Sequence, residues 1–427
     1  MPPNRRPVAG PAVVPVSPRG AVLGTPLAPS ADLGGRFTGR RDLLRLGPAA
    51  RVGRGLSAPA GWSWALRTAI VPWVVARVIV GGALGGAHQL VTQAHTSAAV
   101  VARVRAGLLG WDAGWYEAIA RHGYAGAGHA SLRFFPLFPL LARALSSVPG
   151  IGVGVAVVVV ANVSALVGAA LLAALARRET GDVTLARRAA WLVCLAPPAF
   201  TQVMGYAEGT LLALSIGTML ALRARAWWWA AALGLAAAAT RPVGVLLVVP
   251  AAVEALRGWR DPGAHRRLAR GVAVAGPVAG LAGFLGWVAW RYGDFLAPLR
   301  LQQQGAHRGA LADPLRTLAH DASLLVHGQH LGSALHLPWV VLALALVGVS
   351  LWRWPIAYGA FAGAVVVVAL TASNLDGFER YALSAFPLVL AGATVTSGRR
   401  VERAVLTLAA AGLALYSVLA FSNVYVP

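Results

Sequence analysis

The chain has 427 residues, of which 57% are hydrophobic and only 12% are charged, and its formal net charge at pH 7 is +22. Apolar runs of about fifteen to twenty-five residues recur from Ala65 to the end, which excludes a soluble domain because none could bury them. All basic residues are arginine and they lie in short loops between these runs, which argues against a nucleic-acid-binding surface. We therefore expect an all-α polytopic membrane protein.

The first 60 residues differ from the rest in composition. They are rich in proline, glycine, alanine and arginine, and nine arginines stand against only Asp32 and Asp42. Because such a segment buries too little apolar surface to offset the entropy of ordering it, residues 1–60 are predicted to form a disordered cytoplasmic tail. A signal peptide is not expected, since no apolar region with a small-residue cleavage site follows the early arginines.

Eleven apolar segments are predicted to cross the membrane. Their ranges are 65–86, 151–175, 189–204, 207–222, 227–240, 242–256, 271–290, 338–352, 355–372, 383–397 and 404–422. Several hold only about fifteen residues, or roughly 22 Å of helix, so they are expected beside thinned lipid or around a water-filled cavity. Residues 134–148 are also apolar, but a span there would invert every later loop, so we interpret them as an interfacial or re-entrant helix. Residues 61–427 then form one membrane domain with outer loops at about 87–150 and 291–337.

The arginines predict the orientation of this domain. With a cytoplasmic N-terminus, the cytoplasmic side holds 25 arginines and 7 acidic residues, whereas the outer side holds 11 arginines and 8 acidic residues. This asymmetry satisfies the positive-inside rule and predicts a multi-pass protein of the cell membrane. Trp227, Trp228 and Trp229 are expected to anchor a helix at the inner interface. The segments that are richest in candidate functional groups then fall on the outer face.

The first of these segments is WDAGWYEAIARHGY, residues Trp111 to Tyr124. At helical spacing, Asp112, Trp115 and Tyr116 share one face, which combines a carboxylate with aromatic rings. A carboxylate at the membrane surface can act as a general base toward a hydroxyl group, and aromatic rings suit the apolar faces of sugars. The alternative is an interfacial amphipathic helix that Asp112 caps and whose aromatic residues form an ordinary belt.

Glu208 and Arg241 are ionisable residues that interrupt apolar hairpins. Burial of either residue at the membrane edge is costly unless it is paired or faces a wet cavity. The planar guanidinium group of Arg241 is suited to bidentate contact with a phosphate group. The two residues could instead form a structural ion pair that joins the two hairpins.

Asp376, Glu379, Arg380 and Tyr381 lie between the ninth and tenth predicted spans. An arginine beside an aromatic ring at the membrane surface suits a phosphate or pyrophosphate group, so Glu379, Arg380 and Tyr381 are candidate substrate contacts. A solvated turn with helix-capping charges explains the pattern almost as well.

The long outer loop at 291–337 offers neutral polar groups. Its glutamines suit hydroxyl recognition by hydrogen bonds, and Gln303 is the candidate contact among them. His327 and His330 could share a helical face, but no established ligand pattern such as HExxH is present, so we predict no metal site.

Taken together, these motifs resemble a known family. The segments WDAGWYEAIARHGY, FFPLFPLL (134–141), YAEGT (206–210), TRPVG (240–244), YGDFLAPLRLQQQGAHR (292–308) and FERYALSAFP (378–387) occur in the order found in the PIG-V-like mannosyltransferases. These are bacterial relatives of the enzyme that adds the second mannose of the GPI anchor, and they belong to the GT-C glycosyltransferases. The resemblance covers about residues 65–422. Where the family more often has serine, this chain has Ala207, so no hydroxyl group is essential at that position.

The resemblance implies a GT-C-like bundle of about 11 transmembrane helices with a cavity at the outer face. It also implies a polyprenyl-phosphate sugar donor, with mannose as the sugar and no cofactor. Asp112 would then be the catalytic base, and transfer would invert the anomeric carbon. Arg241 or Arg380 would stabilise the leaving phosphate, while Glu208 would orient the acceptor or the clamping arginine. Because a lipid phosphate is already a competent leaving group, neither a nucleotide site nor a metal ion is required.

Two other classes of protein stay open at the level of sequence. A transporter or flippase of a lipid-linked or anionic substrate shares the apolar composition, but it typically carries ionisable residues near mid-membrane, often within inverted repeats that are not evident here. A non-catalytic scaffold for other envelope enzymes would not need Asp112. For an enzyme, the candidate acceptors are a lipid-anchored glycan, a protein hydroxyl group and a growing polysaccharide.

Overall fold

The computed structural model describes residues 59–93, 98–258, 263–304, 308–327, 336–422 and 425. The predicted tail, apart from its last two residues, lies outside these ranges, and so does His330 of the possible histidine pair. The described residues form helices, and their β-structure is limited to one isolated bridge between Leu311 and Ala372. The all-α architecture expected from the composition is therefore confirmed.

The helices, with α-helices labelled α and 3₁₀-helices labelled η, follow one another through short connections. Their bounds are α2 (Pro59–Gln93), α3 (Ala98–Ala106), η1 (Gly107–Leu109), α4 (Asp112–Ala127), η2 (His129–Arg133), α5 (Leu137–Ser146), α6 (Val153–Thr180), α7 (Val183–Leu195), η3 (Pro197–Gln202), α8 (Glu208–Arg223), α9 (Trp227–Thr240), η4 (Pro242–Leu247), α10 (Val248–Arg257), α11 (Ala264–Tyr292), α12 (Ala297–Gln302), α13 (Pro314–Val326), α15 (Leu337–Arg353), α16 (Ile356–Leu370), α17 (Phe378–Ser384), α18 (Phe386–Val395) and α19 (Arg399–Phe421). Every predicted span coincides with one of these helices or with two in series. Within the described residues, 4 helices (α2, α6, α11 and α19) are long and apolar enough to cross a membrane unaided, so the count of eleven spans stays a prediction.

Proline divides two of the predicted spans. Residues 189–204 are expected as one span, but α7 ends at Leu195 and η3 begins at Pro197. In the same way, residues 383–397 are expected as one span, but α17 ends at Ser384 and Pro387 lies in the first turn of α18. Proline lacks an amide hydrogen and clashes with the preceding turn, so a regular helix cannot run through these positions.

The apolar segment at 134–148 forms the short helix α5. Its 10 residues rise about 15 Å, roughly half the thickness of the hydrocarbon core of a bilayer. α5 packs against α4 and α6, while Leu140 and Leu141 are exposed. A helix of this length supports the interpretation of the segment as interfacial or re-entrant.

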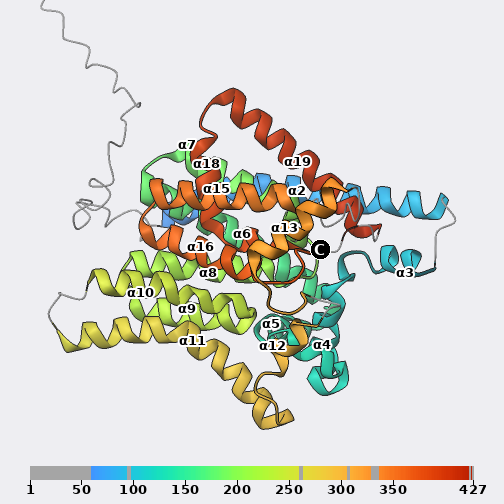
Figure 1. Ribbon diagram of the computed structural model, residues 1–427, viewed down its shortest axis with the longest axis horizontal. Helices are drawn as coiled ribbons and strands as arrows, with labels where there is room; N and C mark the ends of the chain where they lie inside the picture. Colours follow the sequence, from blue (N-terminus) through green and yellow to red (C-terminus); the bar gives the residue numbers. More distant parts are fainter. Residues whose placement is uncertain are drawn as a thin grey trace, which may run out of the picture. The chain divides into compact units, whose positions relative to one another are not determined.

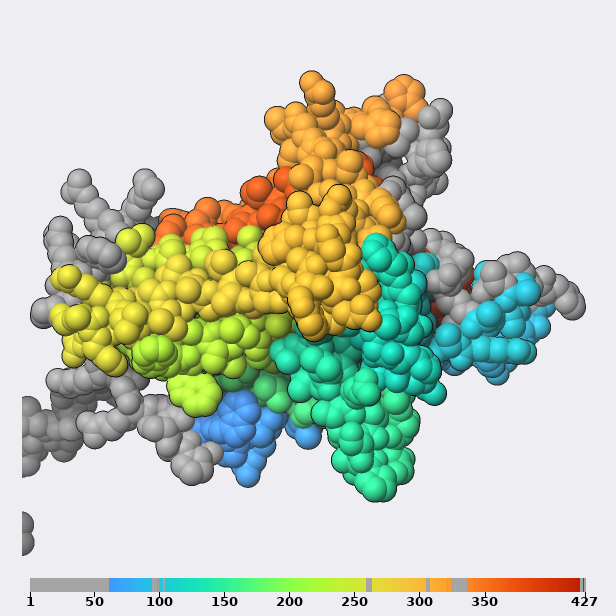
Figure 2. Space-filling view, turned by 90° about the horizontal axis from the view of Figure 1, so that it is seen from below, coloured from blue at the N-terminus to red at the C-terminus, as the bar shows by residue number. Residues whose placement is uncertain are grey.

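The two predicted outer loops pack on each other. In Figure 1, α4, α5 and α12 lie to the right of α9, and α10 ends and α11 begins at the left. Figure 2 shows the segment around α12 lying beside α4 and η2. The contact is a cluster of buried apolar side chains, namely Leu132, Phe135, Phe284, Val288 and Ala297. This packing brings polar groups of both loops to the same end of the molecule.

Glycines bring the backbones of α9 and α11 together. Gly276 and Gly280 lie four residues apart on α11 and face Ala231 and Leu235 of α9. A Cβ atom added at either glycine would overlap the carbonyl group of its neighbour. Small residues at this spacing allow close helix contacts in membranes. The contact fixes α9, whose last residue directly precedes Arg241.

Gly280→Ala is expected to lower the free energy of unfolding by about 1–3 kcal/mol, because the added methyl group forces α9 and α11 apart. Gly283→Ala is the matched control, since nothing lies within 4 Å of a Cβ atom there. Both changes gain the same intrinsic helix propensity, so the comparison isolates packing. Thermal unfolding of the purified protein in detergent measures the difference. Equal melting temperatures for the two variants would contradict the close contact.

Candidate functional site

The site begins at a strained turn before α4. Trp111 has a φ of 57° although it carries a side chain, and such a conformation costs roughly 1–3 kcal/mol. Two hydrogen bonds hold the turn: the Trp111 indole donates to the carbonyl of Ala420 (3.0 Å), and the backbone N–H of Asp112 donates to the hydroxyl of Tyr206 (3.2 Å). Asp112 therefore enters the wall of a cavity in a fixed position.

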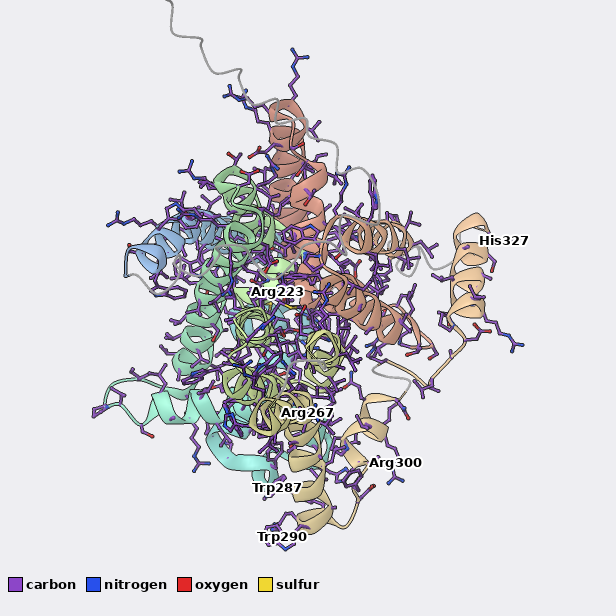
Figure 3. All side chains as sticks on the ribbon, turned by 90° about the vertical axis from the view of Figure 1, so that its left-hand side faces the viewer. Arg223, Arg267, Trp287, Trp290, Arg300 and His327 are labelled. Atoms are coloured by element: carbon purple, nitrogen blue, oxygen red, sulfur yellow. The ribbon has the colours of Figure 1, made fainter. Side chains whose placement is uncertain are left out.

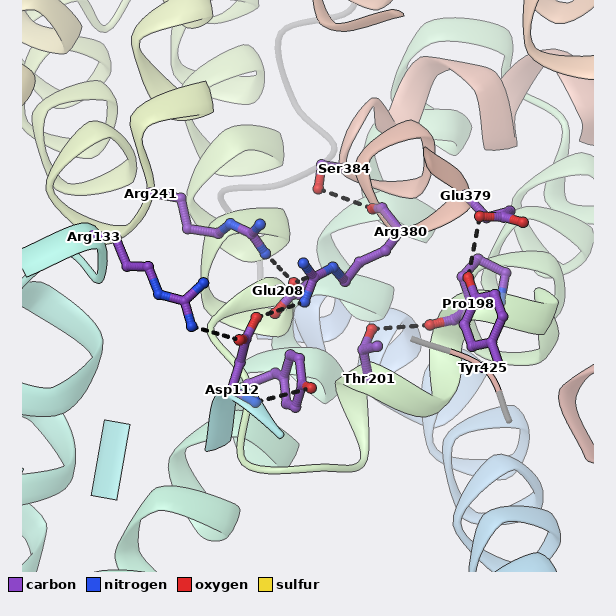
Figure 4. A network of polar contacts seen from close by, with 11 residues as sticks. Asp112, Arg133, Pro198, Thr201, Glu208, Arg241, Glu379, Arg380, Ser384 and Tyr425 are labelled. Carbon is purple, nitrogen blue, oxygen red and sulfur yellow. Dashed lines mark hydrogen bonds and ion pairs between the residues drawn. The ribbon is translucent and has the colours of Figure 1, made fainter. Parts of the chain in front are cut away.

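The carboxylate of Asp112 contacts two arginines. Its Oδ2 accepts a hydrogen bond from Nη1 of Arg380 at 2.9 Å, and its Oδ1 lies 3.8 Å from Nη2 of Arg133. Figure 4 shows both contacts. The carboxylate is thus engaged by guanidinium groups rather than by the first amides of α4, which does not favour the alternative of a helix cap. Its side chain is 27% exposed, so a ligand in the cavity can reach it.

Glu208 lies behind Asp112 and contacts two arginines as well. It is the first residue of α8, and its side chain is only 5% exposed. Its Oε1 forms an ion pair with Nη1 of Arg241 and lies 3.5 Å from Nε of Arg380. Arg380 therefore bridges two carboxylates (Figure 4). We refer to Asp112, Glu208, Arg241 and Arg380 as the charge cluster.

The TRPVG turn positions Arg241 in this cluster. Arg241 has an extended backbone between α9 and η4, as is usual for the residue before a proline. The turn folds back tightly onto α9, because a Cβ atom at Gly244 would overlap the backbone of Ala237. A glycine is therefore required where the turn approaches α9, and the guanidinium group of Arg241 is directed at Glu208.

Three guanidinium groups around Tyr381 give the same wall of the site a positive electrostatic potential. The guanidinium groups of Arg308, Arg241 and Arg380 lie 4.0, 5.2 and 5.3 Å from the centre of its ring. Burial alone raises the pKa of Tyr381, but the charges of Arg308, Arg380 and Arg241 outweigh burial and lower the pKa below its usual 10.0. A wall with this potential is suited to a phosphate group.

A cavity of about 670 Å³ lies against the charge cluster. Its polar lining residues include Asp112, Tyr116, Arg133, Arg241, Gln302, Gln303, Arg308, Thr371, Asp376, Arg380 and Tyr381. Apolar residues, among them Leu246 of η4, Leu281 of α11 and Val365 of α16, form much of the rest of the lining. The volume falls in the range of ligand sites, and the cavity combines an arginine-rich wall with an apolar one. Such a cavity suits a ligand that has both a phosphate group and a hydrocarbon chain.

The structure brings most of the predicted site residues to this cavity. Tyr116 and Gln303 line it together with three residues of the charge cluster and Tyr381. Trp115 lies outside the lining and stacks on Phe134, with ring centres 5.9 Å apart. Its role is therefore to support Phe134, which does line the cavity. Within the described part of the chain, no three His, Cys, Asp or Glu side chains lie close enough to hold a metal ion.

Glu379 is a predicted site residue whose side chain faces away from the cavity. Its carboxylate is fully buried, with Oε1 at 2.8 Å from Nδ1 of His336 and Oε2 accepting a hydrogen bond from the hydroxyl of Tyr425 at 3.1 Å. Although Glu379 precedes Arg380 on α17, Figure 4 shows it turned toward Tyr425. This position does not support a substrate contact for Glu379, and its contacts instead hold α17 in place.

His336 is expected to make stability depend on pH. Burial lowers the pKa of His336, but hydrogen bonding to Asp376 and Glu379 outweighs burial and raises the pKa from 6.5 to about 9. Since the folded pKa exceeds the unfolded one, the stabilisation, on the order of 3 kcal/mol, is complete below about pH 6.5 and is lost as the pH rises through about 9. The melting temperature should fall between about pH 7 and about pH 10 by a few degrees more than in His336→Gln. Parallel curves for the two proteins would contradict a charged His336.

Sequence reasoning missed Arg133 and Arg308. Arg133 lies over the rings of Phe134 and Trp115, at 4.5 and 5.7 Å, and Nη2 of Arg308 donates to the carbonyl of Ala369 at 2.6 Å. Both residues carry positive charge on the predicted outer side, where arginine is the less common choice. An arginine beside an apolar segment on the predicted outer side was the feature of the sequence that could have identified both residues as candidates for the site.

Comparison with known proteins bears on the class of this site. Residues 87–257 match the family described as Mannosyltransferase (PIG-V). No curated protein matches the chain significantly. Among solved structures, ArnT from Cupriavidus metallidurans bound to undecaprenyl phosphate is 17% identical, with a TM-score of 0.47 over 86% of this chain and 77% of that chain. The apo state of the same protein is 18% identical, with a TM-score of 0.45 over 73% of this chain and 71% of that chain.

The matched range contains Asp112, Glu208 and Arg241 of the charge cluster, and Arg133 as well. It also contains four of the six motifs that carry the resemblance in the sequence. The family match confirms the predicted resemblance to the PIG-V mannosyltransferases over residues 87–257, and it supports the enzyme class expected from that resemblance, a membrane glycosyltransferase.

Proposed function

We propose that this protein transfers mannose from a polyprenyl-phosphate donor to a hydroxyl group at the extracytoplasmic face, with inversion of the anomeric carbon. The observation that carries the proposal is the contact of Asp112 with Arg380 in the wall of a cavity that also presents Arg241 and Arg308. A carboxylate beside several guanidinium groups supplies the two functions that the reaction needs, a base and a phosphate clamp.

In the proposed reaction, the carboxylate of Asp112 accepts the proton of the acceptor hydroxyl group as its oxygen attacks the anomeric carbon. The bond between that carbon and the phosphate oxygen breaks, and the polyprenyl phosphate leaves with the electron pair. Arg241 and Arg380 stabilise the charge that gathers on the phosphate. Because the phosphate competes for Arg380, donor binding also loosens the contact between Arg380 and Asp112 and leaves the carboxylate able to accept the proton.

Glu208 acts as a positioning residue in this proposal. Its side chain is only 5% exposed and contacts both Arg241 and Arg380, so it is placed to orient the clamp rather than to meet the acceptor. Tyr116 and Gln303 are the proposed contacts to the sugar, one through its ring and one through hydrogen bonds.

The distribution of charge along α8 and α9 supports the extracytoplasmic location. α8 starts at Glu208 beside the cavity and ends at Arg223, and α9 starts just after Arg225 and ends just before Arg241. The far ends of both helices therefore carry the arginines that the positive-inside rule assigns to the cytoplasm.

The test is a transfer assay on membranes that contain the protein, with labelled polyprenyl-phosphate mannose in one arm and a labelled nucleoside-diphosphate mannose in the other. Label should reach an acceptor from the lipid donor alone, with release of polyprenyl phosphate. Transfer from the nucleotide sugar alone would overturn the donor class. If the correctly inserted protein moves the lipid-linked sugar across the bilayer without breaking its bond to phosphate, the transporter alternative holds instead.

A further inference from the structure

A second hollow, of about 500 Å³, lies where the turn between α8 and α9 meets the start of α11. Its lining includes Arg225, Arg266 and Arg270, the ring of His265 and the three consecutive tryptophans 227–229, and none of the described residues that line it is acidic. Figure 3 views the molecule from this end and marks Arg267, the neighbour of Arg266 on α11.

This hollow and the cavity of the charge cluster lie at opposite ends of the same helix. α9 begins with Trp227 in the hollow and ends at Thr240, directly before Arg241 in the charge cluster. Its 14 residues correspond to about 21 Å of helix. The hollow therefore opens at the other surface of the membrane, which the arginine distribution assigns to the cytoplasm.

The three arginines of the hollow form a floor and a rim. Arg270 is 3% exposed, donates from Nη1 to the carbonyl of Gly258 and lies 5.6 Å from the ring centre of Trp227, so its charge is fixed at the floor. Arg225 and Arg266 are exposed at the rim. The N-terminus of α9 adds partial positive charge at the same place.

The backbone of Arg225 is strained. Its φ is 57°, a conformation that side chains rarely adopt and that costs roughly 1–3 kcal/mol. Trp111, which places Asp112 in the other cavity, shares this feature. The turn at Arg225 ends α8, since the N–H of Ala226 donates to the carbonyl of Ala221 at 2.8 Å, and it places Arg225 at the rim of the hollow.

The tryptophans show at which depth the hollow lies. Trp228 and Trp229 are 51% and 69% exposed, and exposed indole rings at the end of a membrane helix belong at the level of the lipid headgroups. Basic pockets between membrane helices on the cytoplasmic side are suited to anionic lipid headgroups. We propose that this hollow binds the phosphate headgroup of an anionic phospholipid of the inner leaflet. The site is independent of the transfer reaction at the opposite surface.

The proposal is tested by adding short-chain phosphatidylglycerol to the purified full-length protein in detergent and measuring the melting temperature. Phosphatidylglycerol should raise it, and phosphatidylcholine should not. In the double variant Arg225→Gln/Arg266→Gln the Kd should rise about 25-fold, because each arginine near an anionic headgroup contributes roughly a fivefold factor. Arg266→Gln alone, which changes an exposed residue of α11, should raise the Kd about fivefold. This single variant replaces the double variant in the test if the double variant does not fold.

The matched control is Arg267→Gln/Arg400→Gln, which removes two exposed arginines from the same predicted surface but outside the hollow. Its Kd should stay within about twofold of the wild type, since screening weakens charges that do not touch the headgroup. An equal rise in Kd in both double variants would show a general effect of charge and would contradict the proposed site. An equal response to phosphatidylcholine would also overturn it. Stabilisation by inorganic phosphate at the same concentrations would assign the hollow to a soluble phosphate instead of a lipid.

Discussion

Asp112→Asn is expected to lower kcat for mannosyl transfer by about 100-fold to 10,000-fold, the usual contribution of a general base. Asparagine keeps the shape of the side chain and still accepts the hydrogen bond from Arg380, but it cannot take a proton from the acceptor. KM for the lipid donor should change little, because Arg241, Arg308 and Arg380 all stay in the cavity. The measurement is the initial rate of transfer at several donor concentrations.

Glu117→Gln is the matched control for this change. Glu117 lies on the same helix, α4, and pairs with Arg121 at 2.6 Å outside the cavity. An exposed pair of this kind contributes about 0.3–0.5 kcal/mol, so neither folding nor transfer should change measurably. If Asp112→Asn is folded, inserted and transfers mannose at the rate of Glu117→Gln, Asp112 is not the base.

The positions of the helices were largely predictable from the sequence. Apolar runs are long in this chain, and burial in lipid requires each backbone amide to be paired within its own helix. Prolines were the main source of error, as at Pro197 and Pro387, because hydropathy does not register the missing amide hydrogen. Hydropathy also left α5 ambiguous, and the length of the helix supports an interpretation that the arginine distribution had favoured.

The members of the charge cluster were also predictable, but their partners were not. An ionisable residue between apolar runs is easily recognised, since it must form an ion pair or face a water-filled cavity. The contact of Arg380 with Asp112, however, joins residues 268 positions apart and depends on how α17 packs near α4. Glu379 and Arg380 are neighbours in sequence, yet one faces Tyr425 and the other faces the cavity. The pattern of residues between two spans does not specify the rotation of so short a helix.

Glu208→Gln and Arg241→Gln are each expected to destabilise the protein by about 3–5 kcal/mol, because each change leaves a buried charge without its main partner. The double variant removes both charges and keeps the net charge constant, so its melting temperature should recover most of the loss. Transfer should not recover. Without Arg241 the leaving phosphate loses one donor of its clamp, which costs about 100-fold to 1,000-fold in kcat.

This comparison separates the two roles that the sequence left open for Glu208 and Arg241. A purely structural ion pair predicts that activity returns with stability in the double variant, whereas a phosphate clamp predicts a folded and inactive protein. Asp294→Asn/Arg300→Gln provides the control, since that pair lies in an outer loop and is partly exposed, so both measurements should stay near those of the wild type. Activity within a few-fold of the wild type in the double variant Glu208→Gln/Arg241→Gln would remove Arg241 from the clamp and leave Arg380 and Arg308 to hold the phosphate.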